Sequence, residues 1–195
     1  WSSDVCSSDL DPYFLVVGAN PRTKRHADAV TAFASVPAPW RLVLLQRQGT
    51  QRALASLAVS LGIADRIVWV PRVTRERVVT LIQAAGALVQ PSLYEGFGLP
   101  VIEAMACGCP VVASDIGVFR EVAGDAAVYV PAGDAQRLGE ALRALAASAE
   151  RRSDLAARGP VRAARFSWDA CAAQTLEVYH DAWQDRQRAG SGNPS

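Results

Sequence analysis

Two glutamates, Glu95 and Glu103, lie eight residues apart in the stretch QPSLYEGFGLPVIEAMACGCPVVASD, residues 90–115. The loop around Glu95 leads into a segment with helical spacing, which places Glu103 in the first turns of the predicted helix. A carboxylate accepts two hydrogen bonds from a vicinal diol, whereas the free N–H groups at a helix N-terminus bind anions. A ligand that carries both hydroxyls and phosphate, as a nucleotide sugar does, matches this combination. The alternative is that Glu103 complements the helix dipole and that Glu95 is a solvated loop residue.

The amides expected to hold the anion belong to Phe97, Gly98 and Leu99, where the helix begins. Pro100 suits the first helical position, where its missing N–H costs nothing, and Gly108 suits the residue just past the helix end. Apolar runs flank this segment on both sides, so it is predicted as a strand, a crossover helix and a second strand of a parallel sheet. The loop then lies at the carboxyl end of a strand, where open α/β sheets bind their ligands.

The stretch EGFGLPVIEAMACGCPVVASD closely resembles the Glu-x7-Glu region of the retaining GT-B glycosyltransferases, the family called glycosyl transferases group 1. The resemblance covers residues 13 to about 183. It implies that Glu95 holds sugar hydroxyls, that Glu103 holds the ribose diol, and that neither a metal nor another cofactor is required. It also implies that this chain is the C-terminal, donor-binding half of a two-domain enzyme. The form of the motif resembles mannosyltransferase-like members, which favours GDP-mannose as the donor.

A basic loop follows the first predicted strand, residues 13–17, and contains Arg22, Lys24 and Arg25. By the resemblance, Lys24 falls on the lysine of the family, and a cation there would stabilise the diphosphate as the leaving group. The arginine that some members carry after the loop glycine is replaced here by Ala19, so Arg22 or Arg25 is expected to substitute for it. A solvated basic loop is the alternative.

Arg72 and Val73 follow the third predicted strand, at the position where relatives read the base through the main chain. Pro71 stands where the family usually has glycine, and proline removes one N–H donor from this contact. The resemblance therefore makes Arg72 and Val73 candidates for the base site and puts the usual contact in doubt.

The whole pattern predicts an α/β fold, a doubly wound and mainly parallel Rossmann-like sheet of about six strands. Residues 11–185 are expected to form this domain, and residues 186–195 a disordered tail. The first ten residues, WSSDVCSSDL, are polar and non-periodic and match a translated sequencing adapter, so we interpret them as non-native. On this interpretation the natural protein extends upstream into an acceptor-binding half.

Composition argues against several functions. Twenty basic and 19 acidic residues leave a formal charge of +1, without a basic stripe for nucleic acid. No apolar run reaches the roughly 18 residues of a membrane span. The resemblance implies a glycan or lipid-linked acceptor, bound through the other half, and allows peripheral membrane association of the complete enzyme.

The cysteines and histidines give little sign of a site. Cys107 and Cys109 form a single pair without the further ligands that a zinc site needs. We expect the cysteines to be reduced core thiols of a cytoplasmic chain. His26 and His180 are expected at the surface.

Two other functions fit the same fold. One is a nucleotide-sugar epimerase or a phosphorylase, but an epimerase needs acid and base side chains around the sugar, and none beyond the glutamates is visible. The other is a non-catalytic module that binds a nucleotide sugar. An upstream reading frame for a second Rossmann-like domain would support the two-domain enzyme, whereas a start codon near residue 11 would support the module.

Overall fold

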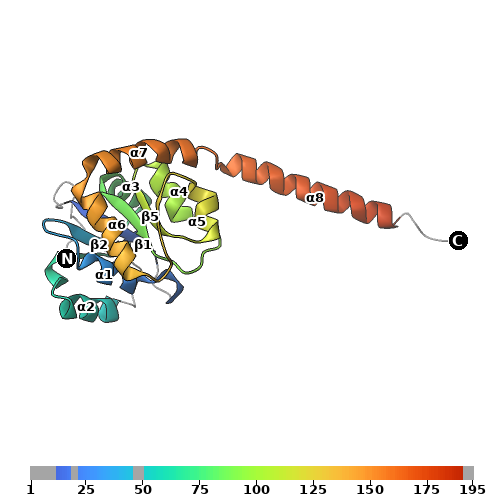
Figure 1. Ribbon diagram of the computed structural model, residues 1–195. Helices are drawn as coiled ribbons and strands as arrows, with labels where there is room; N and C mark the ends of the chain where they lie inside the picture. Colours follow the sequence, from blue (N-terminus) through green and yellow to red (C-terminus); the bar gives the residue numbers. More distant parts are fainter. Residues whose placement is uncertain (1–11, 19–21, 46–50, 191–195) are drawn as a thin grey trace. The chain divides into compact units, whose positions relative to one another are not determined.

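The computed structural model describes residues 12–18, 22–45 and 51–190 (Figure 1). Its strands are β1 (Tyr13–Val17), β2 (Arg41–Leu45), β3 (Ile67–Val70), β4 (Ala87–Gln90), β5 (Val111–Ser114) and β6 (Val128–Val130). They form one six-stranded sheet in the order β3-β2-β1-β4-β5-β6, in which every neighbouring pair is parallel. The predicted doubly wound parallel sheet is confirmed.

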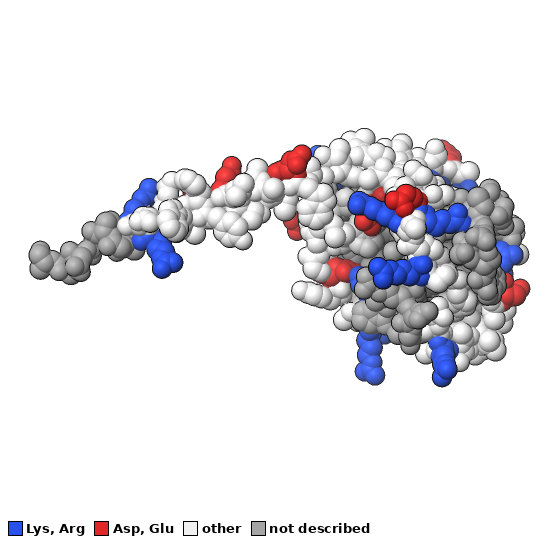
Figure 2. Space-filling model, turned by 180° about the vertical axis from the view of Figure 1, so that it is seen from behind, with Lys and Arg blue, Asp and Glu red and all other residues white. Residues whose placement is uncertain are grey.

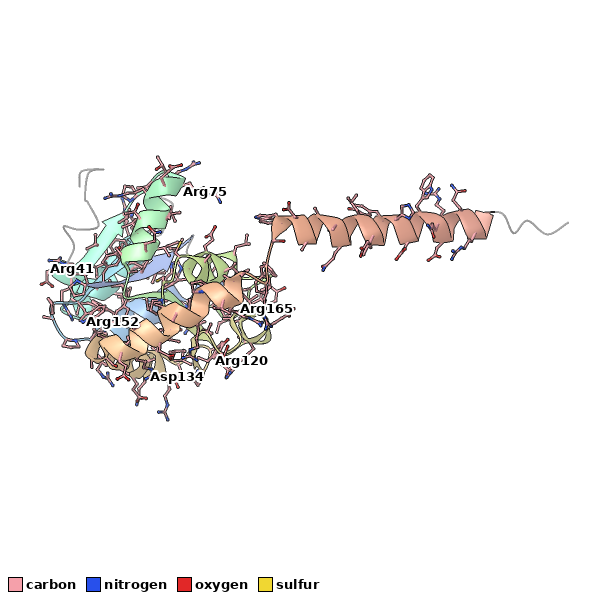
Figure 3. The ribbon with its side chains drawn as sticks, turned by 90° about the horizontal axis from the view of Figure 1, so that it is seen from above. Arg41, Arg75, Arg120, Asp134, Arg152 and Arg165 are labelled. Atoms are coloured by element: carbon pink, nitrogen blue, oxygen red, sulfur yellow. The ribbon has the colours of Figure 1, made fainter. Side chains whose placement is uncertain are left out.

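Helices connect the strands and begin and end at local sequence signals. They are α1 (His26–Phe33), α2 (Gln51–Ser60), α3 (Arg75–Ala84), α4 (Leu99–Ala106), α5 (Gly117–Ala123), α6 (Ala135–Ala147), α7 (Ala149–Ala163) and α8 (Trp168–Gly190), with short 3-10 turns at η2 (Arg22–Lys24) and η3 (Ala64–Arg66). Thr74 accepts a hydrogen bond from the Arg77 amide at the start of α3. Asp134, labelled in Figure 3, accepts one from the Arg137 amide at the start of α6. Threonine and aspartate suit these positions, because short polar side chains satisfy the first amides of a helix.

The strand order reverses direction between β1 and β4. From β1 the chain adds β2 and then β3 on one side, and it returns to place β4 on the other side of β1. The register pairs Phe14 with Ala87 and Leu15 with Leu88. The loops that follow β1 and β4 therefore leave the sheet side by side at its carboxyl edge, which is the position where such sheets bind ligands.

The core is apolar on both faces of the sheet. Strands β1, β2, β4 and β5 are almost wholly buried, as expected for parallel strands covered by helices on both sides. The Phe14 and Trp40 rings stack with centroids 4.5 Å apart. Gly86 lies against this pair, since a Cβ there would stand 2.5 Å from the Trp40 ring. Close packing therefore anchors the central strands at their amino ends, the edge of the sheet opposite the carboxyl loops.

Two close helix contacts hold the outer layers. A Cβ at Gly139 of α6 would lie 2.7 Å from Oγ of Ser35 just after α1, and one at Gly159 of α7 would lie 3.0 Å from the Met105 carbonyl in α4. Glycine is needed at both positions because the helices approach each other so closely. These contacts fix α1 and α4, the two helices that follow the loops at the carboxyl edge.

The C-terminal part differs from the expectation. The chain divides into two compact units, Trp1–Ala163 and Ala164–Ser195, and α8 belongs to the second. The disordered tail was expected to begin at residue 186, but α8 continues to Gly190, so residues 186–190 are helical rather than disordered. Arg and Gln are good helix formers, and Arg188 lies 3.7 Å from Asp185. The residues 191–195 and the suspected non-native residues 1–10 lie outside the described residues.

Other expectations concern the cysteines, the charge pattern and the membrane. Cys109 is buried, which raises the pKa of its thiol to about 12. Cys171 is exposed on α8, so the expectation of a core thiol is wrong there. Figure 2 shows basic side chains mixed with acidic ones on the face that it displays. Among the described helices, none is both long and apolar enough to span a membrane.

Candidate functional site

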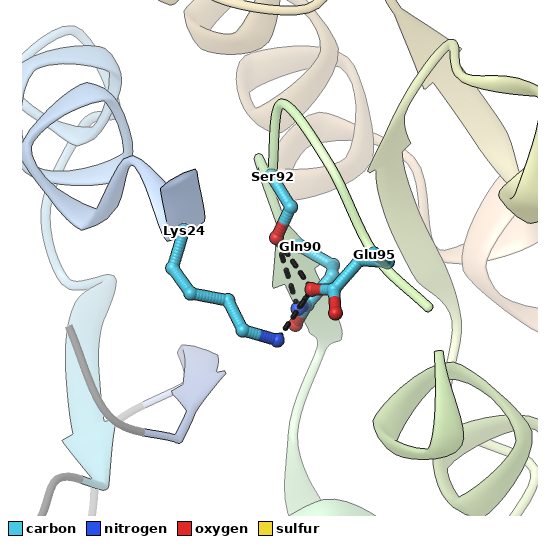
Figure 4. Close-up of polar contacts among 4 residues, drawn as sticks. All are labelled: Lys24, Gln90, Ser92 and Glu95. Carbon is cyan, nitrogen blue, oxygen red and sulfur yellow. Dashed lines mark hydrogen bonds and ion pairs between the residues drawn. The ribbon is translucent and has the colours of Figure 1, made fainter. Parts of the chain in front are cut away.

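An ion pair between Lys24 and Glu95 joins the loops that follow β1 and β4 (Figure 4). Lys24 is the last residue of η2, and its Nζ donates a hydrogen bond to Oε1 of Glu95. The main chain supports the contact, because the Leu93 amide donates to the Thr23 carbonyl at 2.8 Å. The two side chains are only 22% and 11% exposed. The structure therefore brings together the residue predicted to stabilise the diphosphate and the residue predicted to hold the sugar hydroxyls.

Two further side chains donate to the same oxygen of Glu95. Oε1 accepts a hydrogen bond from Nε2 of Gln90 at 2.8 Å and one from Oγ of Ser92 at 2.7 Å. Burial acts to raise the pKa of Glu95, but the hydrogen bonds from Lys24, Ser92 and Gln90 together outweigh it and hold the pKa below its usual value. Glu95 is therefore an ionised acceptor at neutral pH. Sequence reasoning missed Gln90 and Ser92, although a polar pair at the carboxyl end of a buried strand is a usable signal.

His26 is buried directly beside this cluster. It is the first residue of α1 and is 1% exposed, so the expectation that it lies at the surface is wrong. The backbone at Arg25 has a left-handed conformation, with φ of 52°, and this turn starts the helix with His26 on the inner side. Burial and the nearby Lys24 lower the pKa of His26 to about 4, against an opposing effect of Glu95. His26 is therefore neutral at pH 7, whereas His180 is exposed as predicted.

The two candidate arginines of the basic loop have different surroundings. Nε of Arg25 lies 2.7 Å from a carboxylate oxygen of Asp28, in the first turn of α1. This ion pair holds the Arg25 side chain against the first turn of α1. Arg22, at the start of η2, is exposed and makes no ion pair with another described residue. Of the two, Arg22 is the better placed to meet an incoming anion.

The N-terminus of α4 presents open amides at Gly98 and Leu99, two of the three residues predicted to hold an anion. Gly98 is the residue before the helix and has φ of 96°, a conformation that side chains rarely adopt. A Cβ there would also approach the Phe119 ring to 2.9 Å. Within the described part of the chain, the amides of Gly98 and Leu99 have no hydrogen-bond acceptor. With Pro100 in the first turn, these N–H groups point out of the helix N-terminus and can bind an anion.

The remaining predicted residues lie at the same edge of the sheet but outside the cluster. Glu103 is exposed in the second turn of α4, and Phe97 is 45% exposed in the loop before it. Arg72 is exposed and Val73 half-buried after β3. Strand β3 is two strands from β1, at about 4.8 Å per strand, so Arg72 and Val73 lie roughly 10 Å along the edge from the loop that follows β1. The site thus has the extent of a ligand longer than one sugar ring.

No metal site accompanies these groups within the described residues. No group of three or more His, Cys, Asp and Glu side chains there could hold a metal ion.

Comparison with known sequences places the chain in a family. A profile described as "Glycosyl transferases group 1" matches residues 6–162. D-inositol 3-phosphate glycosyltransferase of Xylanimonas cellulosilytica is 37% identical over 181 residues, which cover 90% of this chain and 43% of that protein. O-antigen chain mannosyltransferase B of Escherichia coli is 32% identical over 172 residues, covering 86% and 45%.

Solved structures agree with this assignment. Sucrose-phosphate synthase from Thermosynechococcus elongatus has a TM-score of 0.82 at 30% identity, over 95% of this chain and 47% of that one. Anabaena HepE, solved with UDP and glucose, has a TM-score of 0.80 at 20% identity, over 89% and 49%, a likeness that shows the shared fold. The chain therefore spans about half the length of these proteins or less. The matched profile, the relatives and the GT-B fold together show that this chain belongs to the glycosyl transferases group 1 family.

Proposed function

We propose that this chain is the donor-binding half of a retaining glycosyltransferase, which transfers a hexosyl unit from a nucleotide diphosphate sugar to a glycan or lipid-linked acceptor. The observation that carries the proposal is the meeting of Lys24 and Glu95 at the switch point of the sheet. A cation and an ionised hydroxyl acceptor at one place suit the junction between a diphosphate and a sugar. The family membership and the names of the relatives support the same reaction class.

The residues divide the donor between them. Lys24, Arg22 and the amides of Gly98 and Leu99 face the diphosphate, where their positive charge and N–H groups offset its negative charge. Glu95 accepts hydrogen bonds from the sugar hydroxyls, and Glu103 accepts them from the ribose. Arg72 and Val73 lie toward the base. This division needs no metal ion to neutralise the diphosphate.

GDP-mannose is the first donor to test. The sequence form favours a mannosyl donor, and one relative is named a mannosyltransferase. UDP-glucose is the comparison donor, because a HepE structure contains that molecule. We also place the chain in the cytoplasm, where free thiols such as Cys107 and Cys109 stay reduced. The acceptor, and any association with a membrane surface, belong to the half of the enzyme that binds the acceptor.

Binding measurements separate the roles of the two glutamates. Glu103→Gln is expected to weaken the binding of GDP and of GDP-mannose alike, by about tenfold or more, because the ribose is common to both ligands. Glu95→Gln is expected to weaken GDP-mannose by about tenfold and to tighten GDP about threefold, since the change frees Lys24 from its ion pair. Titration calorimetry on this chain gives all four dissociation constants. Equal losses for both ligands in both variants would contradict the assignment.

The anomeric configuration of the donor is expected to be retained in the product. Glu95 and Glu103 are occupied as hydroxyl acceptors, which leaves no clear general base for an inverting attack. The acceptor hydroxyl then attacks C1 of the sugar from the side on which the diphosphate leaves. As the bond from C1 to the diphosphate oxygen breaks, that oxygen takes the proton of the hydroxyl. Proton NMR of fresh product from the complete gene product, with and without a chelator, measures both configuration and metal dependence. An inverted linkage, or activity that chelation abolishes, would refute this mechanism.

A further inference from the structure

We infer that Gln90 and Ser92 are positioning residues for Glu95, which they hold in place so that its second oxygen, Oε2, receives the sugar. The inference rests on the proposed function and deepens it. It names the groups that keep the Glu95 carboxylate oriented toward the sugar hydroxyls when Lys24 turns to the diphosphate. Both side chains are buried, at 1% and 0% exposure. Neither can reach a ligand directly, so they act through Glu95.

The two oxygens of Glu95 are used unequally. Oε1 accepts three hydrogen bonds, from Lys24, Gln90 and Ser92. Oε2 has no donor among the described residues. Within the described part of the chain, the carboxylate is therefore held at one oxygen and has the other available. An acceptor with one oxygen anchored keeps its rotamer, and the open oxygen has a defined direction for a hydroxyl.

Gln90 and Ser92 direct all their side-chain hydrogens into this cluster. The two N–H groups of Gln90 go to Oγ of Ser92, at 3.2 Å, and to Oε1 of Glu95. The single O–H of Ser92 goes to the same oxygen of Glu95. The three side chains form a closed triangle (Figure 4). Within it, every donor ends on the carboxylate or on a group that itself donates to the carboxylate.

The amide orientation of Gln90 shows which partner it serves. Its carbonyl oxygen Oε1 is buried and has no donor among the described residues. Turning the amide over would place that oxygen against the negative Oε1 of Glu95, so the charge of Glu95 fixes the orientation. An unpaired buried carbonyl destabilises a fold, whereas leucine of similar size would not. The presence of glutamine at position 90 is therefore explained by its hydrogen bond to Glu95 rather than by packing in the core.

Lys24 is the exchangeable donor of the three. Its side chain is 22% exposed and reaches Glu95 from a different loop, whereas Gln90 and Ser92 come from the same segment as Glu95. A diphosphate competes with Glu95 for the Lys24 ammonium. When Lys24 moves, two neutral donors still hold Oε1, and the carboxylate stays ionised and oriented.

One set of variants tests this role. Gln90→Leu and Ser92→Ala are each made in the wild-type chain and in the Lys24→Met variant. In every variant the Glu95 carboxyl is titrated by carbon NMR. Without Lys24, each change is expected to raise the titration midpoint of Glu95 by about one pH unit. Ser92→Thr, which keeps the hydroxyl, is expected to leave the titration midpoint of Glu95 where it is with serine. Ser148→Ala is the matched control, since Ser148 caps α7 through the Arg151 amide and is expected to leave Glu95 unchanged.

Calorimetry with GDP and GDP-mannose provides the second measurement. Gln90→Leu and Ser92→Ala are expected to reduce the preference for GDP-mannose over GDP about fivefold, with the Kd of GDP unchanged. If the wild-type chain binds neither GDP-mannose nor UDP-glucose, the proposed function fails, while the titration still decides whether these residues hold Glu95. Folded variants with an unchanged Glu95 midpoint and an unchanged preference would overturn the inference.

Discussion

Replacing Lys24 with methionine is expected to lower the turnover of the complete enzyme by about 100- to 1000-fold, the range seen when one donor is removed from an oxyanion site. The structure places this ammonium between the loops that follow β1 and β4, against Glu95. In the proposed reaction, negative charge develops on the diphosphate as the bond to the sugar breaks. A cation that faces this group stabilises the transition state more than the ground state, so the loss falls mainly on kcat.

Lys24 can be followed directly, because it is the only lysine in the sequence and the other 19 of the 20 basic residues are arginines. A lysine ammonium is a compact charge on a flexible stem, which suits a group that exchanges between Glu95 and a diphosphate. GDP-mannose is expected to protect Lys24 from an amine-reactive reagent, as detected by peptide mass spectrometry. Lys24→Arg, the charge-conserving control, is expected to lose less turnover than Lys24→Met. Equal turnover in the wild type and Lys24→Met would exclude Lys24 from the chemistry.

Acidification from pH 7.5 to 4.5 is expected to lower the free energy of unfolding by about 2.5 kcal/mol through His26 alone. Burial and Lys24 lower the pKa of His26 from 6.5 to about 4 in the folded chain. Between these two values the unfolded chain binds the proton and the folded chain does not. Stability is therefore fully present above about pH 6.5 and falls as the pH drops toward 4.

Urea denaturation at the two pH values measures this effect. Glu95 contributes a loss in the same direction, because its pKa is also held below the usual value, so the informative quantity is the difference between the wild type and His26→Gln. The variant lacks the titrating ring and is expected to show a pH dependence smaller by about 2.5 kcal/mol. His180→Gln on α8 is the exposed control and is expected to follow the wild type. If His26→Gln does the same, His26 is not the buried neutral group described above.

Local signals in the sequence determined most of the elements. The apolar run from Tyr13 to Val17 forms a strand with those bounds, and Pro100 stands in the first turn of α4 as predicted. The cap residues Thr74 and Asp134 mark the starts of α3 and α6. These features depend on backbone conformation and on contacts within a few residues, which a single sequence records directly.

The sequence also identified Glu95, Lys24 and the amides at the start of α4 as one set. That grouping came from the resemblance to the family, because 71 positions separate Lys24 from Glu95 and no periodic pattern joins them. Their contact follows from the placement of β4 beside β1, which depends on how the whole chain packs. The resemblance thus grouped these residues, and the strand order brings Lys24 and Glu95 together.

Only the tertiary structure decided which polar residues lie inside. His26 stands in the polar run RTKRHAD, where nothing local distinguishes a buried ring from an exposed one, and the left-handed turn at Arg25 places it inward. Gln90 and Ser92 looked like the end of a strand and the start of a loop, and they became partners of Glu95 when the loop folded back over β4. Burial and hydrogen-bond partners of polar groups depend on neighbours distant in sequence, so local patterns do not specify them.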